Sequence, residues 1–270
     1  MSDTSKENKP FGACAPNAAQ RAVIAAAHGS GLKRGAFRPW LSRIVNLLGP
    51  GPIDAQYQGA SFRLYHLASG TERGALFNPD YNLPELDFLR EHLPSGGTFV
   101  DVGANVGTYA IPLAKHVGEN GRVIAIEPHP VSGARLAFNA RASNLGNLTL
   151  VAAAAGDIDG TLMIETDGEN LGASHITETG GIKVPAKKLI SVLNVNSVTG
   201  IDALKIDVEG YEDRVLIGFF RDSKESLWPK AVAIEHLERK VWLRDCIADM
   251  VGFGYAIAGK TRSNTLLVLR

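Results

Sequence analysis

Two acidic residues, Asp101 and Glu127, stand where apolar runs give way to loops, and such carboxylates can bind a nucleoside. Around Asp101, apolar and β-branched residues lead into a turn that contains Gly103 and Gly107. Glycine permits positive φ and close backbone approach, and a helical pattern follows, so residues 98–107 predict a strand, a tight loop and a helix start. In an open α/β sheet, ligands bind at such junctions, where N–H groups of the helix N-terminus are free. The loop is therefore predicted to form the floor of a nucleotide-sized pocket.

The glycine spacing argues against two common phosphate-binding loops. A dinucleotide fingerprint that ended at Gly107 would need glycines where the chain has Val102 and Ala104. The Lys-Ser/Thr end of a P-loop is also missing, so the loop offers no basic side chain to a pyrophosphate. The loop instead begins with Asp101, whose carboxylate would repel phosphate and would suit an ammonium or sulfonium group.

Glu127 ends a second apolar run, twenty positions after Gly107. At this place a carboxylate can accept both hydrogen bonds of a ribose diol. S-adenosylmethionine has such a diol and a cationic sulfur, and it carries no phosphate. We therefore predict S-adenosylmethionine as the ligand.

A second acidic cluster follows the predicted strand 202–207. Asp207 and Glu209 should emerge at the ligand-bearing edge of the sheet, beside the first strand. Two carboxylates held this close should have pKa values that are pushed apart, unless Lys205 or another cation compensates. Either carboxylate could accept a proton from a substrate.

Glu235 and His236 close the neighbouring predicted strand, 230–235, at the same edge. The ordinary pKa of histidine suits a general base near pH 7, so His236 is a further candidate base; a structural role at the strand end is the alternative. Asp207, Glu209 and Glu235 could instead hold Mg²⁺, which favours oxygen ligands.

Three other polar residues are weaker candidates. Asp157 follows the third strand and could meet the adenine amino group, although Gly156-Asp157 is equally a turn pair. Ser174 and His175 lie in a long Gly-rich segment, 168–181, which is predicted to be a loop. They could reach over the donor as substrate contacts, or they could be ordinary surface residues.

Four motifs together resemble the FkbM-type S-adenosylmethionine-dependent methyltransferases. They are Asp-Val-Gly-Ala-Asn-Val-Gly at 101–107, Ile-Glu-Pro at 126–128, Asn139 with Asn144, and Lys-Ile-Asp-Val-Glu-Gly-Tyr-Glu at 205–212. The first is moderately specific for class I methyltransferases, and the last singles out the family. The resemblance runs from about Phe62 to the C-terminus. One departure is Leu189-Ile190, where the family usually has Leu-Asp, so no role for that aspartate can be carried over.

The resemblance implies a class I methyltransferase domain that methylates a hydroxyl of a sugar, glycolipid or secondary metabolite. Direct transfer needs mainly placement, which can supply about 7 to 11 kcal/mol, and a general base adds about 10²- to 10⁴-fold. A Mg²⁺-assisted enzyme, a non-catalytic S-adenosylmethionine-binding module and an NAD-dependent oxidoreductase are the alternatives.

The candidate site residues fall into three groups. The cofactor-binding candidates are Asp101, Gly103, Asn105, Gly107, Glu127, Pro128 and Asp157. The catalytic candidates are Lys205, Asp207, Glu209 and His236. The substrate candidates are Ser174, His175 and Glu235.

Composition limits the partners. The chain has 270 residues, 45% of them hydrophobic, which is enough for one main domain with an appendage. Lys plus Arg equals Asp plus Glu at 28 each and no basic block appears, so there is no electrostatic reason to expect nucleic acid or an anionic membrane. Cys14 and Cys246 have neither metal nor disulfide spacing, and no apolar run reaches the roughly 18 residues of a membrane span. We expect a soluble cytoplasmic protein; its acceptor and its oligomeric state cannot be inferred.

The pattern of elements predicts an α/β fold: a doubly wound, Rossmann-like, seven-stranded and mostly parallel sheet with an N-terminal helical extension. The last strand should be antiparallel because the preceding turn is too short for a crossover helix. The predicted strands of this sheet are 98–104, 122–127, 148–155, 202–207, 230–235, 254–259 and 265–270. The predicted helices between them are 107–117, 130–143, 211–220 and 240–251. Outside this sheet, we predict helices at 18–27, 37–48 and 82–93 and short strands at 61–67, 161–165 and 183–187. The expected organisation is a disordered tail at 1–16, a helical extension or cap at 17–60, and a methyltransferase domain at 61–270.

Overall fold

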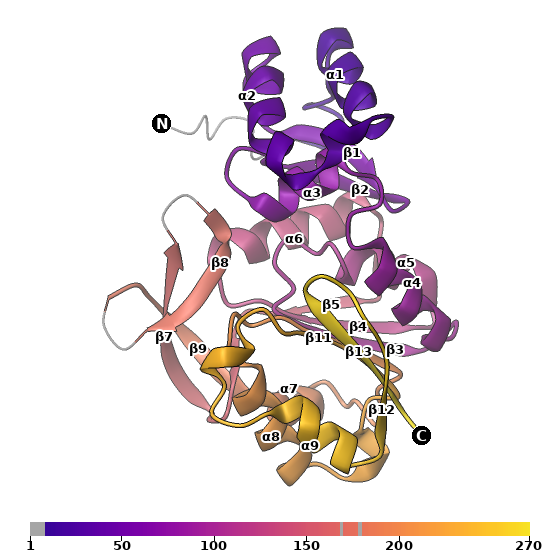
Figure 1. The fold of residues 1–270 in the computed structure, drawn as a ribbon, viewed down its shortest axis with the longest axis vertical. Coiled ribbons are helices and arrows are strands. Elements are labelled where there is room, and N and C mark those ends of the chain that lie inside the picture. The colour runs from indigo at the N-terminus through magenta and orange to yellow at the C-terminus, as the bar shows by residue number, and fades with distance from the viewer. Residues whose placement is uncertain (1–8, 168–169, 178–179) are drawn as a thin grey trace.

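A seven-stranded sheet forms the centre of the computed structural model, which describes the backbone of residues 9–167, 170–177 and 180–270 and the side chains of residues 9–165 and 180–270. Its strands are β3 (Thr98–Val102), β4 (Arg122–Ile126), β5 (Leu148–Val151), β10 (Ala203–Ile206), β11 (Ala231–Glu235), β12 (Tyr255–Lys260) and β13 (Asn264–Leu269). They lie in the order β12-β13-β11-β10-β3-β4-β5 (Figure 1). The five strands from β11 to β5 are parallel, whereas β13 is antiparallel to both of its neighbours. The predicted sheet and its antiparallel last strand are confirmed.

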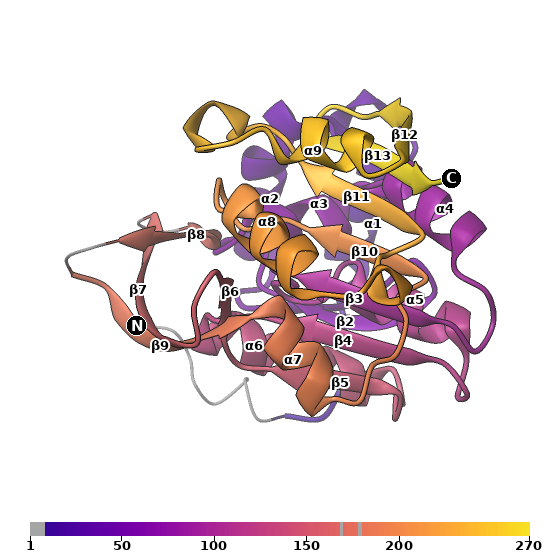
Figure 2. The same ribbon diagram turned by 90° about the horizontal axis from the view of Figure 1, so that it is seen from below.

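Helices cover both faces of the sheet (Figure 2). One face packs on α4 (Leu83–His92), α5 (Ala110–Val117) and α6 (Pro130–Ala142), and the other on α7 (Leu189–Val195), α8 (Glu212–Asp222) and α9 (Cys246–Gly252). Successive strand residues point to opposite faces, so Phe99 joins the first core and Val100 the second. The sequence pattern did not predict α7. The last predicted helix was too long, because residues Arg239–Val241 form a separate 3₁₀ turn.

A second, four-stranded sheet lies beside the central one. Its strands are β6 (Ala154–Gly156), β7 (Gly160–Asp167), β8 (Asn170–Thr177) and β9 (Ile182–Lys188), in the order β6-β9-β7-β8. The predicted strand 148–155 is therefore divided between the two sheets. The prediction of a loop over 168–181 was wrong for residues 170–177, because β8 pairs with β7 there.

The N-terminal part forms a small lobe that shares its core with the sheet. Its elements are α1 (Ala18–His28), α2 (Arg38–Leu48), β1 (Ile53–Tyr57), β2 (Ala60–Leu64) and α3 (Gly70–Phe77). Helices α1 and α2 agree with prediction, whereas β1 and α3 were missed. The expected boundary between residues 60 and 61 falls inside the β1–β2 hairpin.

A buried ion pair fixes the chain before α1. Arg63 donates from Nε to Asp54 Oδ1 at 2.7 Å, and both side chains are about fully buried. Asp54 also accepts the N–H groups of Gly12 and Cys14, while Arg63 donates to the carbonyl of Pro10. Residues 9–14 of the segment expected to be disordered are thus bound to the hairpin. Among the described residues, no helix combines the length and the hydropathy of a membrane span.

Candidate active site

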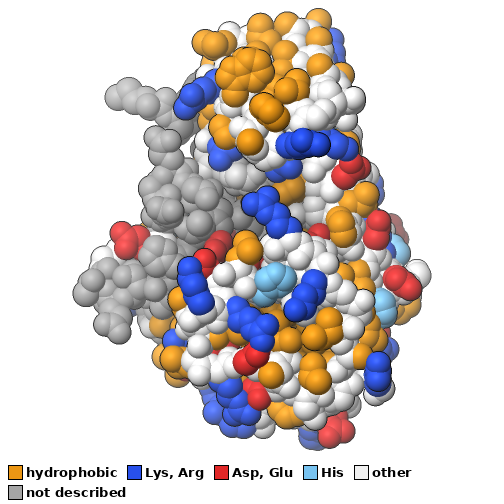
Figure 3. Space-filling view, viewed as in Figure 1, with side chains coloured by type: hydrophobic (Ala, Val, Ile, Leu, Met, Phe, Trp, Pro, Cys, Tyr) orange, Lys and Arg blue, Asp and Glu red, His pale blue; other side chains and the backbone are white. Residues whose placement is uncertain are grey.

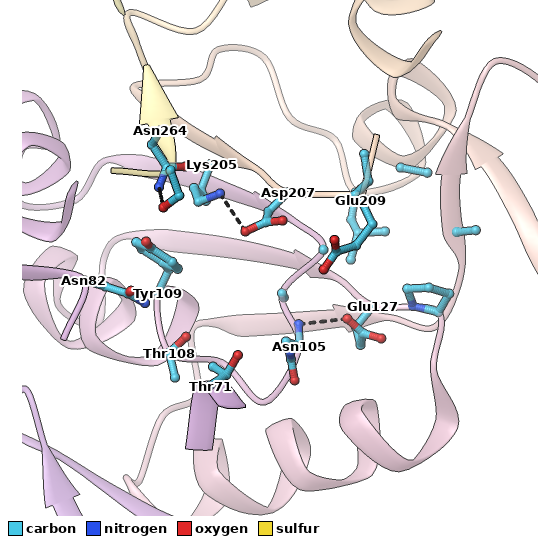
Figure 4. A pocket seen from close by; sticks show the side chains of 18 of the residues that line it. Thr71, Asn82, Asn105, Thr108, Tyr109, Glu127, Lys205, Asp207, Glu209 and Asn264 are labelled. Atoms are coloured by element: carbon cyan, nitrogen blue, oxygen red, sulfur yellow. Dashed lines mark hydrogen bonds and ion pairs between the residues drawn. The ribbon is translucent and has the colours of Figure 1, made fainter. Parts of the chain in front are cut away.

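A pocket opens at the carboxyl ends of β3, β4 and β10 (Figure 4). Its wall contains residues 103–105 after β3, 126–128 after β4, and 207–209 after β10. These are the loops that parallel strands place at one edge of a doubly wound sheet, as predicted from the sequence.

Gly103 allows two of these loops to lie in contact. Its φ is +83°, a left-handed conformation that favours glycine, and a Cβ atom at this position would overlap the carbonyl oxygen of Asp207. Gly103 therefore lets the ends of β3 and β10 approach each other. Gly107 is not part of the pocket wall; a Cβ there would instead meet Ile111, so its role is packing of α5.

Glu127 lies in the pocket wall with its carboxylate fixed from behind. Oε2 accepts the backbone N–H of Asn105 and Oε1 accepts that of His129, both at 2.8 Å. Burial raises the pKa of Glu127 to about 7, although these two hydrogen bonds oppose the rise. Each carboxylate oxygen has a second lone pair, so Glu127 can still accept the two hydroxyls of a diol. Asn105 and Pro128 also line the pocket.

Asp101 occupies a different place from the one predicted. Its side chain is 1% exposed and is not part of the pocket wall. In the described part of the chain neither carboxylate oxygen has a hydrogen-bond partner. Burial raises the pKa of Asp101 to about 7, against the opposing effect of the Lys205 charge. The expected contact between Asp101 and a ligand cation is not supported by this placement.

Lys205 and Asp207 form an ion pair at the pocket. Lys205 is 1% exposed, and its Nζ donates to the carbonyl of Ile206 at 3.0 Å and to Asp207 Oδ2 at 3.2 Å. The same Nζ lies 5.4 Å from the ring centroid of Tyr109. Lys205 is therefore held in place, and it orients one oxygen of Asp207, whose side chain is 38% exposed and lines the pocket.

Glu209 belongs to the loop after β10 and lines the pocket, with a left-handed φ of +51°. The side chain of Glu209 is exposed to solvent, and the rest of the pocket wall partly encloses it. This enclosure, and then the neighbouring carboxylates of Asp207 and Glu235, raise the pKa of Glu209 to about 7. A carboxylate with this pKa is a stronger base than an ordinary glutamate and is still ionised above pH 7.

Asp207 also belongs to a cluster of three carboxylates. One oxygen each of Asp207, Glu212 and Glu235 lies within 4.8 Å of the others. Glu235 is 5% exposed; its Oε1 accepts the N–H of Leu237 at 2.6 Å, and its Oε2 has no partner among the described residues. Glu212, and not the expected Glu209, completes this possible cation site. Glu235 itself is outside the pocket wall, so its expected substrate contact is not supported.

Of the remaining candidates, the structure places His236 and Asp157 outside the pocket wall. His236 bonds through Nδ1 to Thr265 Oγ1 at 3.0 Å and is not part of the wall. Asp157 accepts a 3.3 Å hydrogen bond from the hydroxyl of Tyr211 and is also outside it. Ser174 and His175 lie on β8, whose side chains are outside the described residues.

Sequence reasoning missed the opposite wall of the pocket. This wall carries uncharged polar side chains from α3, from the loops before α4 and α5, and from the turn that leads into β13. They are Thr71, Tyr81, Asn82, Thr108, Tyr109, Ser263 and Asn264. Asn264 is 2% exposed; its Nδ2 donates to Glu85 at 3.1 Å, while its Oδ1 has no partner among the described residues. The one readable signal was Ser69 three positions before Glu72, a helix-start pattern, and Ser69 does cap α3.

A comparison with protein-family models gives a match. A family model described as "Methyltransferase FkbM domain" matches residues 101–244. A comparison with curated protein sequences gave no significant match.

Among solved structures, the chain is similar to the TYW2 protein of M. jannaschii in complex with AdoMet (15% identity, 80% of this chain and 83% of that chain, TM-score 0.42). It is also similar to the Pyrococcus abyssi tRNA (uracil-54, C5)-methyltransferase in complex with S-adenosyl-L-homocysteine (13%, 80% and 43%, 0.46). A third similar structure is an rRNA methylase from Streptococcus thermophilus (12%, 69% and 95%, 0.41).

Proposed function

The chain belongs to the FkbM methyltransferase family and is an S-adenosylmethionine-dependent methyltransferase, and from this premise we propose that it methylates a hydroxyl group of a small molecule. Sugars, glycolipids and secondary metabolites are the proposed acceptor classes. An NAD-dependent oxidoreductase, the alternative considered from the sequence, does not fit this family.

One observation carries the proposal: the pocket offers hydrogen-bond acceptors that lack donors. Asn264 Oδ1 is buried without a partner, and Glu209 and Asp207 add carboxylate oxygens from the facing loop. A buried acceptor without a partner costs about 1 to 3 kcal/mol, which a hydroxyl of the acceptor substrate can offset by donating to it. A hydroxyl also has the proton that must leave when its oxygen is methylated.

The charges of the pocket wall suit the donor. In the described part of the wall the only cation is Lys205, which is paired with Asp207, whereas Glu127 and Glu209 are acidic. This wall would repel a pyrophosphate and attract a sulfonium. We infer that the ribose binds Glu127 and that the loop of residues 103–105 packs against the adenosine. Bound there, S-adenosylmethionine supplies a methyl group that is activated for direct transfer.

The protein's own chemical task is then to orient one hydroxyl and remove its proton. The reacting hydroxyl has one proton, so we infer that Asp207, held by Lys205, aligns the acceptor by accepting a hydrogen bond from a neighbouring hydroxyl. Glu209 is the proposed proton acceptor, because its pKa near 7 makes it a stronger base than an ordinary glutamate. In this proposal Asn264 holds a second hydroxyl of the acceptor.

A cation-assisted reaction is the second candidate. The unpartnered Oε2 of Glu235, beside Asp207 and Glu212, favours it, because three carboxylate oxygens in close proximity suit Mg²⁺ or Ca²⁺. A bound divalent cation would lower the pKa of an acceptor hydroxyl. Asp207, Glu212 and Glu235 are the residues that would hold it.

The test is transfer of a labelled methyl group to a panel of acceptors. The panel contains monosaccharides, glycolipids and phenolic or polyketide alcohols, each paired with an analogue whose hydroxyls are already methylated. Label in the hydroxyl forms only supports the proposal, whereas label in amines or RNA and in none of the alcohols contradicts it. Parallel reactions with EDTA, and with EDTA followed by excess Mg²⁺, separate the two candidates: only a cation-assisted enzyme loses activity and regains it.

A further inference from the structure

The outer surface of the α1–α2 lobe exposes large apolar side chains. Along α2, Trp40 and Leu47 lie on one side of the helix because they are two turns apart, and they are 56% and 84% exposed. Phe37 and Leu48, at the two ends of α2, are 44% and 41% exposed. Figure 3 shows hydrophobic side chains gathered over the end of the molecule that α1 and α2 form, with Lys and Arg side chains beside them. We call the surface formed by Phe37, Trp40, Leu47 and Leu48 the α2 face.

The α2 face is well ordered by the packing beneath it. Ala27 and Val45 are fully buried between α1, α2 and the rest of the lobe. Gln20 crosses from α1 and donates to the carbonyls of Val45 and Gly49 at 3.0 and 2.8 Å. Asn17 and Gln20 form a reciprocal capping box at the start of α1. The apolar side chains of the α2 face are therefore presented to the outside by a rigid support.

The segment that carries the α2 face has charged residues of one sign only. Residues 17–52 contain five Lys or Arg residues and no Asp or Glu, although the whole chain has 28 of each sign. These five are Arg21, Lys33, Arg34, Arg38 and Arg43. Lys33 pairs with Asp80 at 2.6 Å, and Arg38 stacks over Tyr81. Arg21, Arg34 and Arg43 are exposed and have no acidic partner among the described residues.

We propose that the α2 face docks the protein on the surface of an anionic lipid bilayer. Exposed Trp, Phe and Leu side chains enter the headgroup region, where the aromatic rings are favoured. Arginines at the edge of such a face meet anionic headgroups, which attract basic residues near the surface. The apolar residues of the α2 face meet the first requirement, and the arginines of the same segment meet the second.

The same features disfavour two other partners. In a contact with a second copy through this face, three unpaired arginines would meet three unpaired arginines, and like charges repel. A nucleic acid would satisfy the arginines and leave Leu47 without a partner at 84% exposure. Of these three partners, only a bilayer accommodates both the cations and the aliphatic side chains.

The docked face is connected to the pocket by a single helix. Helix α2 packs against α3, and Thr71 at the start of α3 lines the pocket. Docking does not depend on the acceptor proposed above, because it rests on residues outside the pocket.

The experiment is co-sedimentation of the full chain with lipid vesicles. One set contains phosphatidylcholine alone, and the other contains phosphatidylcholine with 30% phosphatidylglycerol, as about a third of anionic lipid gives a negative surface. We expect at least about tenfold stronger binding to the anionic vesicles, weakened by salt because the cations contribute. Equal or absent binding to the two sets would overturn the proposal.

Two pairs of substitutions locate the contact. Trp40→Ser with Leu47→Ser removes apolar contact, and Arg34→Glu with Arg43→Glu reverses charge; each pair should weaken binding to anionic vesicles about tenfold or more. Val195→Ser with Leu243→Ser is the matched control, because these side chains are 85% and 79% exposed elsewhere, and its binding should be unchanged. All variants alter exposed side chains, so unchanged melting temperatures and donor binding should show that they fold.

Three results would contradict docking through the α2 face. The first is vesicle binding that neither pair of substitutions weakens. The second is a dimer in sedimentation velocity that Trp40→Ser with Leu47→Ser dissociates in the absence of lipid. The third is tighter binding to a mixed-sequence oligonucleotide than to anionic vesicles. Loss of methyl transfer with intact vesicle binding would instead count only against the proposed function.

Discussion

The backbone N–H of Asn105 donates a 2.8 Å hydrogen bond to Oε2 of Glu127, which ties the loop after β3 to the end of β4. Asn105 reaches this position with a left-handed φ of +50°. The other carboxylate oxygen accepts the N–H of His129. Glu127 is therefore both a support for two loops and a proposed ligand contact, so a substitution there must be judged by donor affinity and by stability.

Glu127→Gln should weaken donor binding about tenfold or more. An amide has one acceptor oxygen, so its NH₂ group would face one of the two backbone N–H groups and would change the hydrogen bonds offered to a diol. Isothermal titration with S-adenosylhomocysteine measures the effect. Glu119→Gln, on the exposed loop after α5, is the control and should bind as the unsubstituted protein does. If both variants bind equally well, Glu127 is not a ribose contact.

Gly103→Ala should destabilise the protein by more than about 3 kcal/mol, because the new Cβ would overlap the carbonyl oxygen of Asp207 and would occupy a left-handed conformation. Gly59→Ala, in the turn between β1 and β2, is the control: φ is +79° there, but nothing lies within 4 Å of the added atom. It should cost only about 1 kcal/mol, the ordinary cost of positive φ. Urea unfolding measures both. Equal losses would show that the β3 and β10 loops move apart easily.

The sequence could predict the parts of this molecule that depend on neighbouring residues. The alternation of strand and helix patterns predicted the parallel sheet. The junctions after β3 and β4 predicted where Gly103, Asn105 and Glu127 lie. The orientation of the Asp101 side chain could not be predicted in this way. Strand side chains alternate between two faces, and helices cover both faces of this sheet, so a charged residue within β3 is buried on either face.

The wall formed by Thr71, Tyr81 and Asn264 could not be predicted, because it comes from segments nearly 200 positions apart. The same holds for the α2 face. Its basic residues are scattered over more than twenty positions from Arg21 to Arg43, so no charge block appears in the chain, and the overall balance of 28 against 28 hides their segregation. Folding of α1 onto α2 brings them to one end of the molecule.

Glu209→Gln should lower turnover about 10²-fold or more and leave donor affinity within about threefold, because the proposed base is removed while the donor-binding loops remain. In the unsubstituted enzyme kcat/KM for the acceptor should rise with pH through a midpoint at or below about 7. The base must be deprotonated to work, burial and neighbouring carboxylates raise its pKa to about 7, and a bound cation would lower it. Stopped assays with labelled donor between pH 5 and 9 measure this profile, which should flatten in the variant.

His236→Ala separates the two bases considered for this enzyme. Since His236 bonds to Thr265 and is outside the pocket wall, turnover of this variant should stay within about twofold of normal. If kcat/KM still rises with pH in Glu209→Gln and no longer does so in His236→Ala, the histidine is the base that accepts the proton.

Asp101→Asn should stabilise the protein at alkaline pH. Burial raises the pKa of Asp101 from 3.8 to about 7, so the folded chain retains a proton that the unfolded chain has already lost between these pH values. The unfolded state then binds fewer protons, and the free energy of unfolding falls as pH rises from about 4 to about 7. Asparagine stays neutral and avoids this loss, which should raise the free energy of unfolding by about 1 to 3 kcal/mol at pH 8 and change it little at pH 4. Urea unfolding at these two pH values tests the sign, with the exposed Asp87→Asn expected to stay within about 0.5 kcal/mol at both. Lower stability of the Asp101 variant at pH 8 would mean that Lys205 keeps this carboxylate charged. A large loss of donor affinity in the same variant would show that Asp101 contacts the ligand after all.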